Sequence, residues 1–184
     1  GHGATAVADV KTENTQKKFG TTAAYFDGTG DYISLPASND YAFGTDIFTV
    51  DLWSYTSTAT LETGVQRRLI SFDLFSNISV DISLDTDGYI NVYWSSALKI
   101  QGTVNIADGA WHHIALVRDS SNNVKLYVDG TQDGSTASES GLFVSGANGI
   151  FVGRYYSGNG HFLGYIDELR ISKGIARWTA NFTP

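Results

Sequence analysis

Two aspartates, Asp27 and Asp31, bracket a short glycine-rich stretch with the sequence DGTGD. The stretch offers two carboxylates four residues apart, together with backbone carbonyl groups. A hard cation such as Ca²⁺ prefers oxygen ligands of this kind. The stretch is therefore a candidate calcium site, and a plain turn with an Asp at each end is the alternative interpretation.

A second candidate site lies at 48–55, FTVDLWSY, which alternates as a strand does. Side chains point to opposite faces along a strand, so Asp51, Trp53 and Tyr55 share one face. Rings of this kind stack on sugars, and a carboxylate accepts hydrogen bonds from hydroxyl groups. This face is a candidate sugar-binding surface on the concave side of a sheet. The alternative is that Trp53 is half-buried in a curved sandwich, with Tyr55 at its rim.

A third candidate site is the polar loop at 154–161, RYYSGNGH. Loops on a rigid sheet scaffold often carry function. The side chains that would contact a ligand here are Arg154, Tyr155, Tyr156, Asn159 and His161. The sequence does not decide between this loop and the 51–55 face, and a loop tip with incidental aromatic residues is the alternative.

Motifs for catalysis are missing from the sequence. His112 and His113 are adjacent, so on a strand they face opposite sides and do not readily bind one metal ion. There is no HExxH motif, no Gly-x-Ser-x-Gly elbow, no phosphate loop and no Cys. The stretch at 83–94 superficially resembles an EF-hand loop, but Ser83 and Trp94 stand where carboxylate ligands are needed.

The elements that must position these residues are β-strands. The clearest is a hairpin at 108–130, in which apolar runs at 111–117 and 124–128 flank a polar turn. Further strands are expected at these ranges: 23–26, 32–35, 48–55, 67–75, 78–84, 89–94, 150–152 and 162–172. The segment 131–145 is expected to be a long loop with a short strand at 142–144, because it is rich in Ser and Gly.

Two features near the end of the chain carry specific expectations. Alternation breaks at Asp167-Glu168, which predicts a β-bulge that re-aims one carboxylate. Trp178 and Phe182 are four residues apart, as in a helix, but the better interpretation is that they pin the C-terminal segment onto the core.

Composition and charge narrow the class of protein. The chain has 184 residues with 13% aromatic residues, 20 Gly and only 2 Pro, which is typical of an all-β domain. A net charge of −7 argues against nucleic-acid binding, which needs clustered Lys and Arg. No run of 18 apolar residues occurs, so membrane insertion is not expected.

Four motifs occur along the chain in this order: FDGTGDYISL, FTVDLWSY, DGAWHHIALVRDSSNNVKLYVDG and GYIDELRIS. Together they resemble the laminin-G-like family of the concanavalin A-like lectin/glucanase superfamily. The resemblance implies an all-β jelly-roll sandwich of two curved antiparallel sheets at 19–184. The segment 1–18 precedes it, with an edge strand and a GHG start typical of a cloning remnant.

The resemblance also implies a structural Ca²⁺. In several branches of the superfamily the ion joins the early glycine loop to an Asp on the last strand. That Asp matches Asp167 here, and the loop matches Asp27 and Asp31.

Hydrolases of the superfamily carry Glu-x-Asp-x-x-Glu on one strand, and no Glu of this chain is spaced that way. The pairs Asp73–Asp81 and Asp81–Asp85 could in principle serve for retaining hydrolysis. Because Asp81 and Asp85 run into a turn, hydrogen-bonding caps explain them better. We therefore expect a protein that is not an enzyme.

The expected function is a lectin-like carbohydrate-binding module with a structural calcium ion and an oligo- or polysaccharide ligand. The alternative is a protein-interaction or structural module of a larger adhesin, cell-surface or virion protein, and a glycoside hydrolase is the remote alternative. The closing GIARWTANFTP resembles versions in bacterial, marine and phage-associated proteins. We therefore expect an extracellular, cell-surface or virion-associated location.

Overall fold

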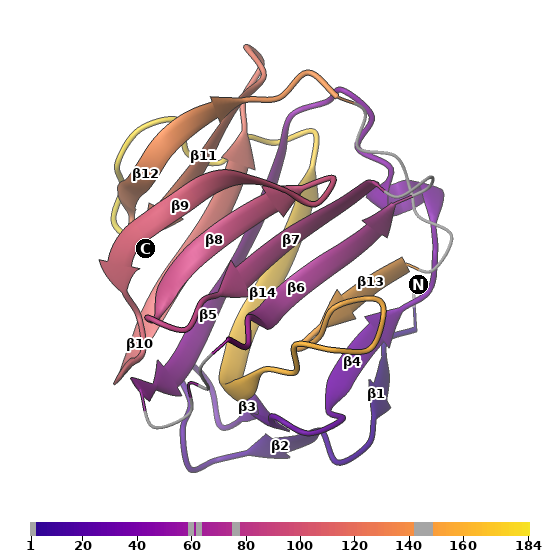
Figure 1. The fold of residues 1–184 in the computed structure, drawn as a ribbon, viewed down its shortest axis with the longest axis vertical. Coiled ribbons are helices and arrows are strands. Elements are labelled where there is room, and N and C mark those ends of the chain that lie inside the picture. Colours follow the sequence, from indigo (N-terminus) through magenta and orange to yellow (C-terminus); the bar gives the residue numbers. More distant parts are fainter. Residues whose placement is uncertain (1–2, 59–60, 62–63, 75–77, 142–148) are drawn as a thin grey trace.

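The computed structural model describes residues 3–58, 61, 64–74, 78–141 and 149–184, and it consists almost entirely of β-strands (Figure 1). A short 3-10 helix, η1, spans Asn39–Tyr41. Among the described residues, no helix has the length and apolar character needed to cross a membrane. The strands are β1 (Thr5–Val7), β2 (Lys11–Glu13), β3 (Ala23–Asp27), β4 (Tyr32–Leu35), β5 (Phe48–Ser57), β6 (Arg67–Leu74), β7 (Ile78–Leu84), β8 (Tyr89–Trp94), β9 (Ala97–Asn105), β10 (Asp108–Arg118), β11 (Asn123–Val128), β12 (Thr131–Ser138), β13 (Gly149–Val152) and β14 (Leu163–Lys173).

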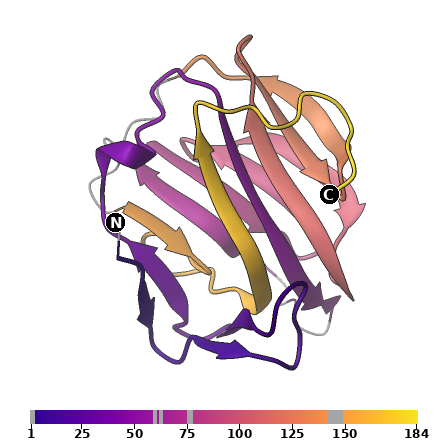
Figure 2. The same ribbon diagram turned by 180° about the vertical axis from the view of Figure 1, so that it is seen from behind.

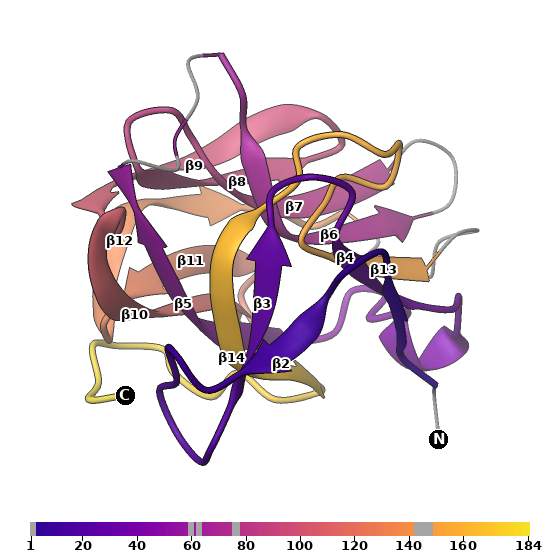
Figure 3. The same cartoon turned by 90° about the horizontal axis from the view of Figure 1, so that it is seen from below.

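The strands form two antiparallel sheets that pack face to face, as a jelly-roll sandwich does (Figures 1 and 2). Sheet A has the order β1-β4-β13-β6-β7-β8-β9, and sheet B has the order β12-β11-β10-β5-β14-β3-β2. The view from below shows the two layers and their curvature (Figure 3). The predicted all-β sandwich is confirmed. The N-terminal segment adds one edge strand to each sheet, β1 and β2.

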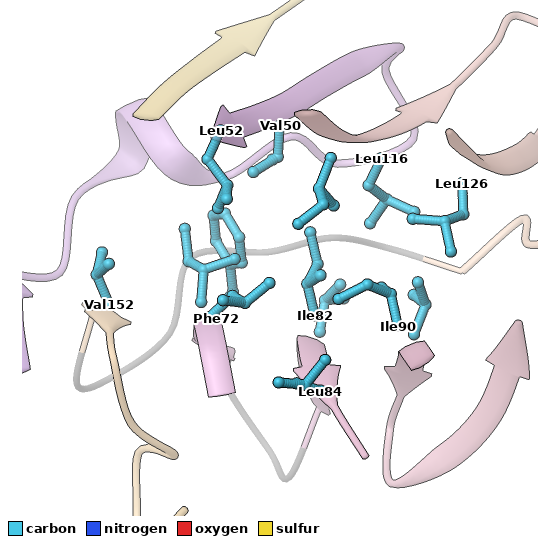
Figure 4. Close-up of a cluster of buried hydrophobic side chains, with 14 of the residues drawn as sticks. Val50, Leu52, Phe72, Ile82, Leu84, Ile90, Leu116, Leu126 and Val152 are labelled. Carbon is cyan, nitrogen blue, oxygen red and sulfur yellow. The ribbon is translucent and has the colours of Figure 1, made fainter. Parts of the chain in front are cut away.

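The core lies between the two sheets and is made by the alternating apolar residues that the sequence shows. In Figure 4, Val50, Leu52, Leu116 and Leu126 of sheet B face Phe72, Ile82, Leu84, Ile90 and Val152, which come from sheet A. The predicted hairpin is present, with Ile114 opposite Val128 and Leu116 opposite Leu126. Apolar burial of this kind is the main favourable term in folding.

Two strands differ from the expectation. Thr131–Ser138 forms β12, whereas its Ser and Gly content predicted a loop. Pairing with β11 at the edge of sheet B supplies the hydrogen bonds of β12, so local propensity is overridden. Asp133 of β12, which is buried, also accepts hydrogen bonds from the Thr103 amide and hydroxyl at 2.8 and 2.7 Å. Strand β9, which contains Thr103, was not predicted, and the strand expected at 142–144 lies outside the described residues.

Candidate functional site

The outer face of sheet A carries a grid of polar side chains on neighbouring strands. Ser71 of β6 lies opposite Asp81 of β7, and Asp81 lies opposite Tyr93 of β8. One step along the strands, Ser83 of β7 lies opposite Asn91 of β8. These residues alternate with core residues such as Ile82, so they point away from the core. Ser71, Asp81, Ser83 and Asn91 are nevertheless at most 4% exposed, because other parts of the chain stand around them.

A groove of about 680 Å³ lies over this face, and we call it the sheet A groove. This volume is in the usual range for small-ligand sites. Its lining combines sheet residues, the residues before β6 and the loop after β13: Gly64, Val65, Gln66, Arg68, Asp81, Asp85, Thr86, Tyr93, Ser96, Tyr155, Asn159 and Gly160.

The loop at 154–161 forms one wall of the groove because backbone hydrogen bonds fix it to β6 (Figure 1). The amide of Arg68 donates to the carbonyl of Gly160 at 2.8 Å, and the amide of Gly153 donates to Leu69 at 3.0 Å. Gly160 has φ +65°, and a Cβ atom there would lie 2.6 Å from the Gln66 carbonyl oxygen. Glycine is therefore required for this close approach.

The side chains of the groove offer rings, donors and acceptors together. The Arg68 guanidinium lies 4.8 Å from the centre of the Tyr155 ring, and its Nη1 donates to the Gln66 carbonyl. Gln66 Nε2 donates to the Tyr93 hydroxyl at 2.6 Å. Asn159 is exposed at the rim. Sugar ligands require this mixture of ring faces and hydrogen-bonding groups.

Asp85, in contrast, is committed to the turn between β7 and β8. Its Oδ1 accepts from the amides of Asp87 and Tyr89, both at 2.9 Å, and its Oδ2 accepts from Asn91 Nδ2 at 3.3 Å. This agrees with the expectation that an Asp at this turn acts as a hydrogen-bonding cap.

Of the residues predicted to bind a ligand in the 154–161 loop, some line the sheet A groove and others contact the rest of the domain. Tyr155 and Asn159 line the sheet A groove. The Tyr156 ring lies 4.3 Å from the Tyr155 ring. Arg154 instead stacks on Tyr32, with 3.6 Å between guanidinium carbon and ring centre. His161 turns inward as well, since its Nδ1 lies 3.5 Å from the Asp31 carbonyl oxygen and its own carbonyl accepts from Arg67.

The other predicted surface, on the outer face of sheet B, has a buried carboxylate. Asp51 is 3% exposed and accepts from Arg170 Nε at 3.0 Å and from Nη2 at 2.7 Å. His113 Nε2 lies 3.5 Å from Asp51 Oδ2. Burial raises the pKa of the Asp51 carboxyl, but the hydrogen bonds from His113 and Arg170 outweigh it and hold the pKa below its usual range. Both oxygens of this carboxylate accept hydrogen bonds from Arg170 within the domain, so Asp51 has a structural role.

Trp53 and Tyr55 lie on the same face of sheet B as Asp51, as expected. Trp53 contacts Lys18, whose Nζ lies 3.9 Å from the ring centre, and also contacts Phe19 and His113. Tyr55 lies between Trp111 and Tyr165, with ring centres 5.7 and 5.9 Å away. A groove of about 440 Å³ remains here, lined by Phe19, Asp51, Trp53, His113, Glu168, Leu169, Arg170, Trp178 and Pro184.

The C-terminal segment 174–184 covers part of this face (Figures 2 and 3). Trp178 and Phe182 stack with 3.9 Å between ring centres and 5° between planes. They pack on Ala115, Val117 and Tyr127, which form a second, small apolar cluster. The two rings do pin the C-terminal segment, as expected, but they pin it to the outer face of sheet B and not to the core between the sheets.

The predicted bulge on β14 is confirmed. The pairing of β14 with β5 shifts between Asp167 and Arg170, and Glu168 has φ +50°. Asp167 Oδ1 accepts from the Glu168 amide at 2.9 Å, and Oδ2 accepts from the amides of Lys18 and Phe19. Asp167 therefore caps the bulge and holds the segment 18–19.

The predicted calcium residues do not form one ligand set. Asp31 is fully buried and accepts backbone N–H bonds from Asp9 at 2.8 Å and Asp27 at 2.9 Å, while Asp27 accepts from Thr29 at 2.7 Å. Asp27 lies opposite Leu163 of β14, and Asp167 is four residues further on, roughly 13 Å along the strand. In the part of the chain that the structure describes, no three His, Asp or Glu residues are grouped to hold a metal ion. These residues do not fit a shared calcium ion.

Several groove residues were not predicted as ligand contacts: Gln66, Arg68, Asp81, Asp85 and Tyr93. The signal that indicates Arg68, Asp81, Asp85 and Tyr93 is the polar half of the alternating pattern in 67–94. Gln66 lies just before this pattern. In sequence alone, that pattern is equally typical of an ordinary solvent-facing side of a sheet.

Comparisons with known proteins agree with this architecture. Residues 27–177 match a laminin G family model described as the concanavalin A-like lectin/glucanases superfamily. No curated protein matches the chain. Domain 4 of AbnA, a GH43 extracellular arabinanase from Geobacillus stearothermophilus in complex with arabinotriose, is similar with TM-score 0.71 and 24% identity, over 93% of this chain and 82% of that one.

Two further solved structures share the fold. The binding domain of Paraclostridial Mosquitocidal Protein 1 has TM-score 0.70 and 14% identity, over 94% of this chain and 44% of that one. Domains LG4-5 of the mouse laminin alpha1 chain have TM-score 0.57 and 21% identity, over 80% of this chain and 40% of that one. This chain thus spans less than half the length of either structure. Since the family model covers most of the chain, the chain belongs to the concanavalin A-like lectin/glucanase superfamily.

Proposed function

We propose that this chain is a non-catalytic carbohydrate-binding module and that its ligand lies in the sheet A groove. The observation that carries the proposal is the lining of the groove, where Tyr93 and Tyr155 stand beside Arg68, Asp81 and Asn159. The rings would contact the apolar faces of a sugar. The polar groups would bond its hydroxyl groups.

Buried polar atoms near the groove support a hydroxyl-rich ligand. Ser71 Oγ and Asn91 Oδ1 are buried on the outer face of sheet A and make no hydrogen bond with the residues that the structure describes. Arg68 Nε is also buried and makes no hydrogen bond with the described residues. Buried polar atoms without partners are costly. Of these three residues Arg68 lines the groove, so a hydroxyl-rich ligand there would supply a partner for Arg68 Nε.

The rigid wall of the groove also supports binding. The 154–161 loop is tied to β6 through Gly153 and Gly160, so Tyr155 is held in place before a ligand arrives. Preorganised side chains lose little conformational entropy on binding, which improves affinity.

The non-catalytic part of the proposal rests on the carboxylates of the groove. A retaining glycosidase needs one carboxyl group as nucleophile and a second as acid/base, about 5 Å apart. Asp81 and Asp85 are the two carboxylates among the described lining residues. Asp85 accepts two hydrogen bonds from backbone amides at its turn and a third from the Asn91 side chain of β8, which leaves it poorly suited to exchange protons with a substrate.

The similar arabinanase domain suggests which ligands to test first. That domain was solved with arabinotriose, so arabinan oligosaccharides are among the first ligands to test here. That enzyme is extracellular, and we extend the proposal to an extracellular or surface location for this chain.

The test is a glycan array that includes arabinan oligosaccharides, followed by isothermal titration calorimetry on the glycans that bind. A reducing-sugar assay on the same glycans tests the non-catalytic part. The proposal predicts saturable binding without release of reducing ends. Failure to bind any glycan would contradict the binding proposal, and release of reducing ends that is lost in Asp81→Asn would contradict the non-catalytic part.

A further inference from the structure

Negative charge outweighs positive charge in the sheet A groove. Among the described residues that line it, Arg68 brings one positive charge, and Asp81 and Asp85 bring two negative charges. The whole chain carries a net charge of −7, so its long-range field has the same sign.

A further carboxylate lies close to the wall of the groove. A hydrogen bond with Tyr155 raises the pKa of the Tyr156 phenol, and the charges of Asp73 and Asp81 add to the rise. Both carboxylates therefore act on the loop that carries Tyr155. Asp73 and Asp81 are 6% and 1% exposed, so water screens their charges little.

The one cation of the described lining, Arg68, is engaged in part within the protein. Arg68 donates from Nη1 to the Gln66 carbonyl at 3.1 Å, and its guanidinium lies against the Tyr155 ring. Strong recognition of an acidic sugar requires a guanidinium whose fork is turned to the ligand carboxylate. Here the guanidinium supports the wall that presents Tyr155.

We infer that the sheet A groove selects glycans without acidic groups, and that Asp81 and Asp85 reject uronate-containing, sialylated and sulfated glycans. This inference rests on the proposed function and names its ligand class. Like charges that meet at an interface weigh strongly against binding, and they weigh more where the dielectric constant is low. A neutral sugar, in contrast, carries no charge for these carboxylates to repel.

The experiment uses matched ligands, so that only charge differs. The neutral glycan that binds best is compared with the same glycan after oxidation of its primary alcohols to carboxylates, and with its sulfated form. Affinities are measured by titration calorimetry at about 20 mM and about 300 mM NaCl. We expect the acidic forms to bind about tenfold more weakly or worse at low salt, and this difference to shrink at high salt.

Variants locate the effect. Asp81→Asn should narrow the difference between neutral and acidic forms. Glu168→Gln, which removes the same charge from an exposed residue of β14 on the other sheet, should leave the difference unchanged. Because Asp81 is buried, a thermal melt first checks that Asp81→Asn is folded. If it is not, the salt dependence of the wild-type protein decides.

The outcomes separate this inference from the proposed function. Equal binding of neutral and acidic forms would overturn the charge selection and leave glycan binding intact. Preference for the acidic forms would also overturn it and would assign recognition to Arg68. If neither form of any glycan binds, the proposed function fails and this inference fails with it.

Discussion

The two outer faces of the sandwich are built by the same alternation of side chains, but one face is left open and the other is partly covered by the chain itself. Sheet A presents polar residues such as Ser71, Asp81 and Asn91, and a groove remains open above them. Sheet B presents Ala115, Val117 and Tyr127, and the chain covers them with Trp178 and Phe182.

The difference follows from what each face needs. An apolar outer face exposed to water is unfavourable, so the chain's own C-terminal rings remove it from solvent. A polar outer face needs hydrogen-bond partners, which water or a sugar can supply. If the ligand lies in the sheet A groove, as we propose, aromatic residues alone are a poor guide to the binding face, because Trp53 and Trp178 lie on the more covered face.

Removing the cover of sheet B should have the largest effect on stability. Trp178→Ala removes the stack on Phe182 and the contact with His113. We expect a loss of about 2–3 kcal/mol in the free energy of unfolding, below the range for a fully buried Trp because Trp178 is half-buried. Urea denaturation measures it. Ile175→Ala, at an exposed position of the same segment, is the matched control and should change stability by less than about 0.5 kcal/mol. An equal effect of both variants would show that the cover does not depend on the Trp178 ring.

Changing the rim of the sheet A groove should affect binding and spare stability. Asn159→Ala removes an amide that we expect to bond the ligand, which should weaken glycan affinity about fivefold, or about 1 kcal/mol. Ser157→Ala, in the exposed part of the same loop, is the control. Titration calorimetry compares the two. Equal affinities for both variants and the wild type would exclude Asn159 from the site.

His112, within strand β10, should make stability depend on pH. His112 Nδ1 lies 2.7 Å from Asp129 Oδ2, and Nε2 lies 3.0 Å from Asp108 Oδ1. Burial lowers the pKa of the imidazole, but the hydrogen bonds that it donates to Asp129 and Asp108 outweigh this effect and raise the pKa above 6.5. The added stability is therefore full below the unfolded pKa and is lost as the pH rises through the folded pKa.

His112→Gln removes this contribution. We expect the free energy of unfolding to be higher in the wild type than in the variant, and this difference to be up to roughly 1 kcal/mol larger at about pH 5.5 than at about pH 8.5. The effect is modest because both carboxylates are half-exposed. Urea midpoints at the two pH values give the comparison. If the difference in unfolding free energy between wild type and variant is the same at both pH values, His112 does not titrate in this way.

Calcium should have the smallest effect. Because Asp31 and Asp167 use both carboxylate oxygens for backbone N–H groups, we expect the melting temperature to be the same in excess Ca²⁺ and in EDTA. A rise of several degrees with Ca²⁺, lost in Asp167→Ala, would restore the calcium site that the sequence predicts.

Much of the fold is predictable from the sequence because local patterns repeat in it. The 108–130 hairpin follows from two alternating runs and a polar turn, and the bulge at Asp167-Glu168 follows from one broken alternation. Strand β12 was missed because its pairing with β11, and not its own residues, makes it a strand.

The site is less predictable because its residues meet only across strands. The loop residues Tyr155 and Asn159 stand out in the sequence, whereas Arg68, Asp81 and Tyr93 are separated by a dozen residues or so and come together through the register of β6, β7 and β8. Arg154 and His161 have suitable chemistry as well, and the contacts that the structure shows for them lie within the domain. Their role as ligand contacts stays a prediction.

The most direct test of the account compares the two faces with one glycan. Tyr155→Ala removes a ring from the sheet A groove, and Trp53→Ala removes a ring from the sheet B face. If the ligand lies in the sheet A groove, titration calorimetry will show that Tyr155→Ala weakens glycan affinity about tenfold and that Trp53→Ala changes it by less than about twofold. Loss of affinity in Trp53→Ala, with Tyr155→Ala unchanged, would contradict the assignment and place the ligand on sheet B.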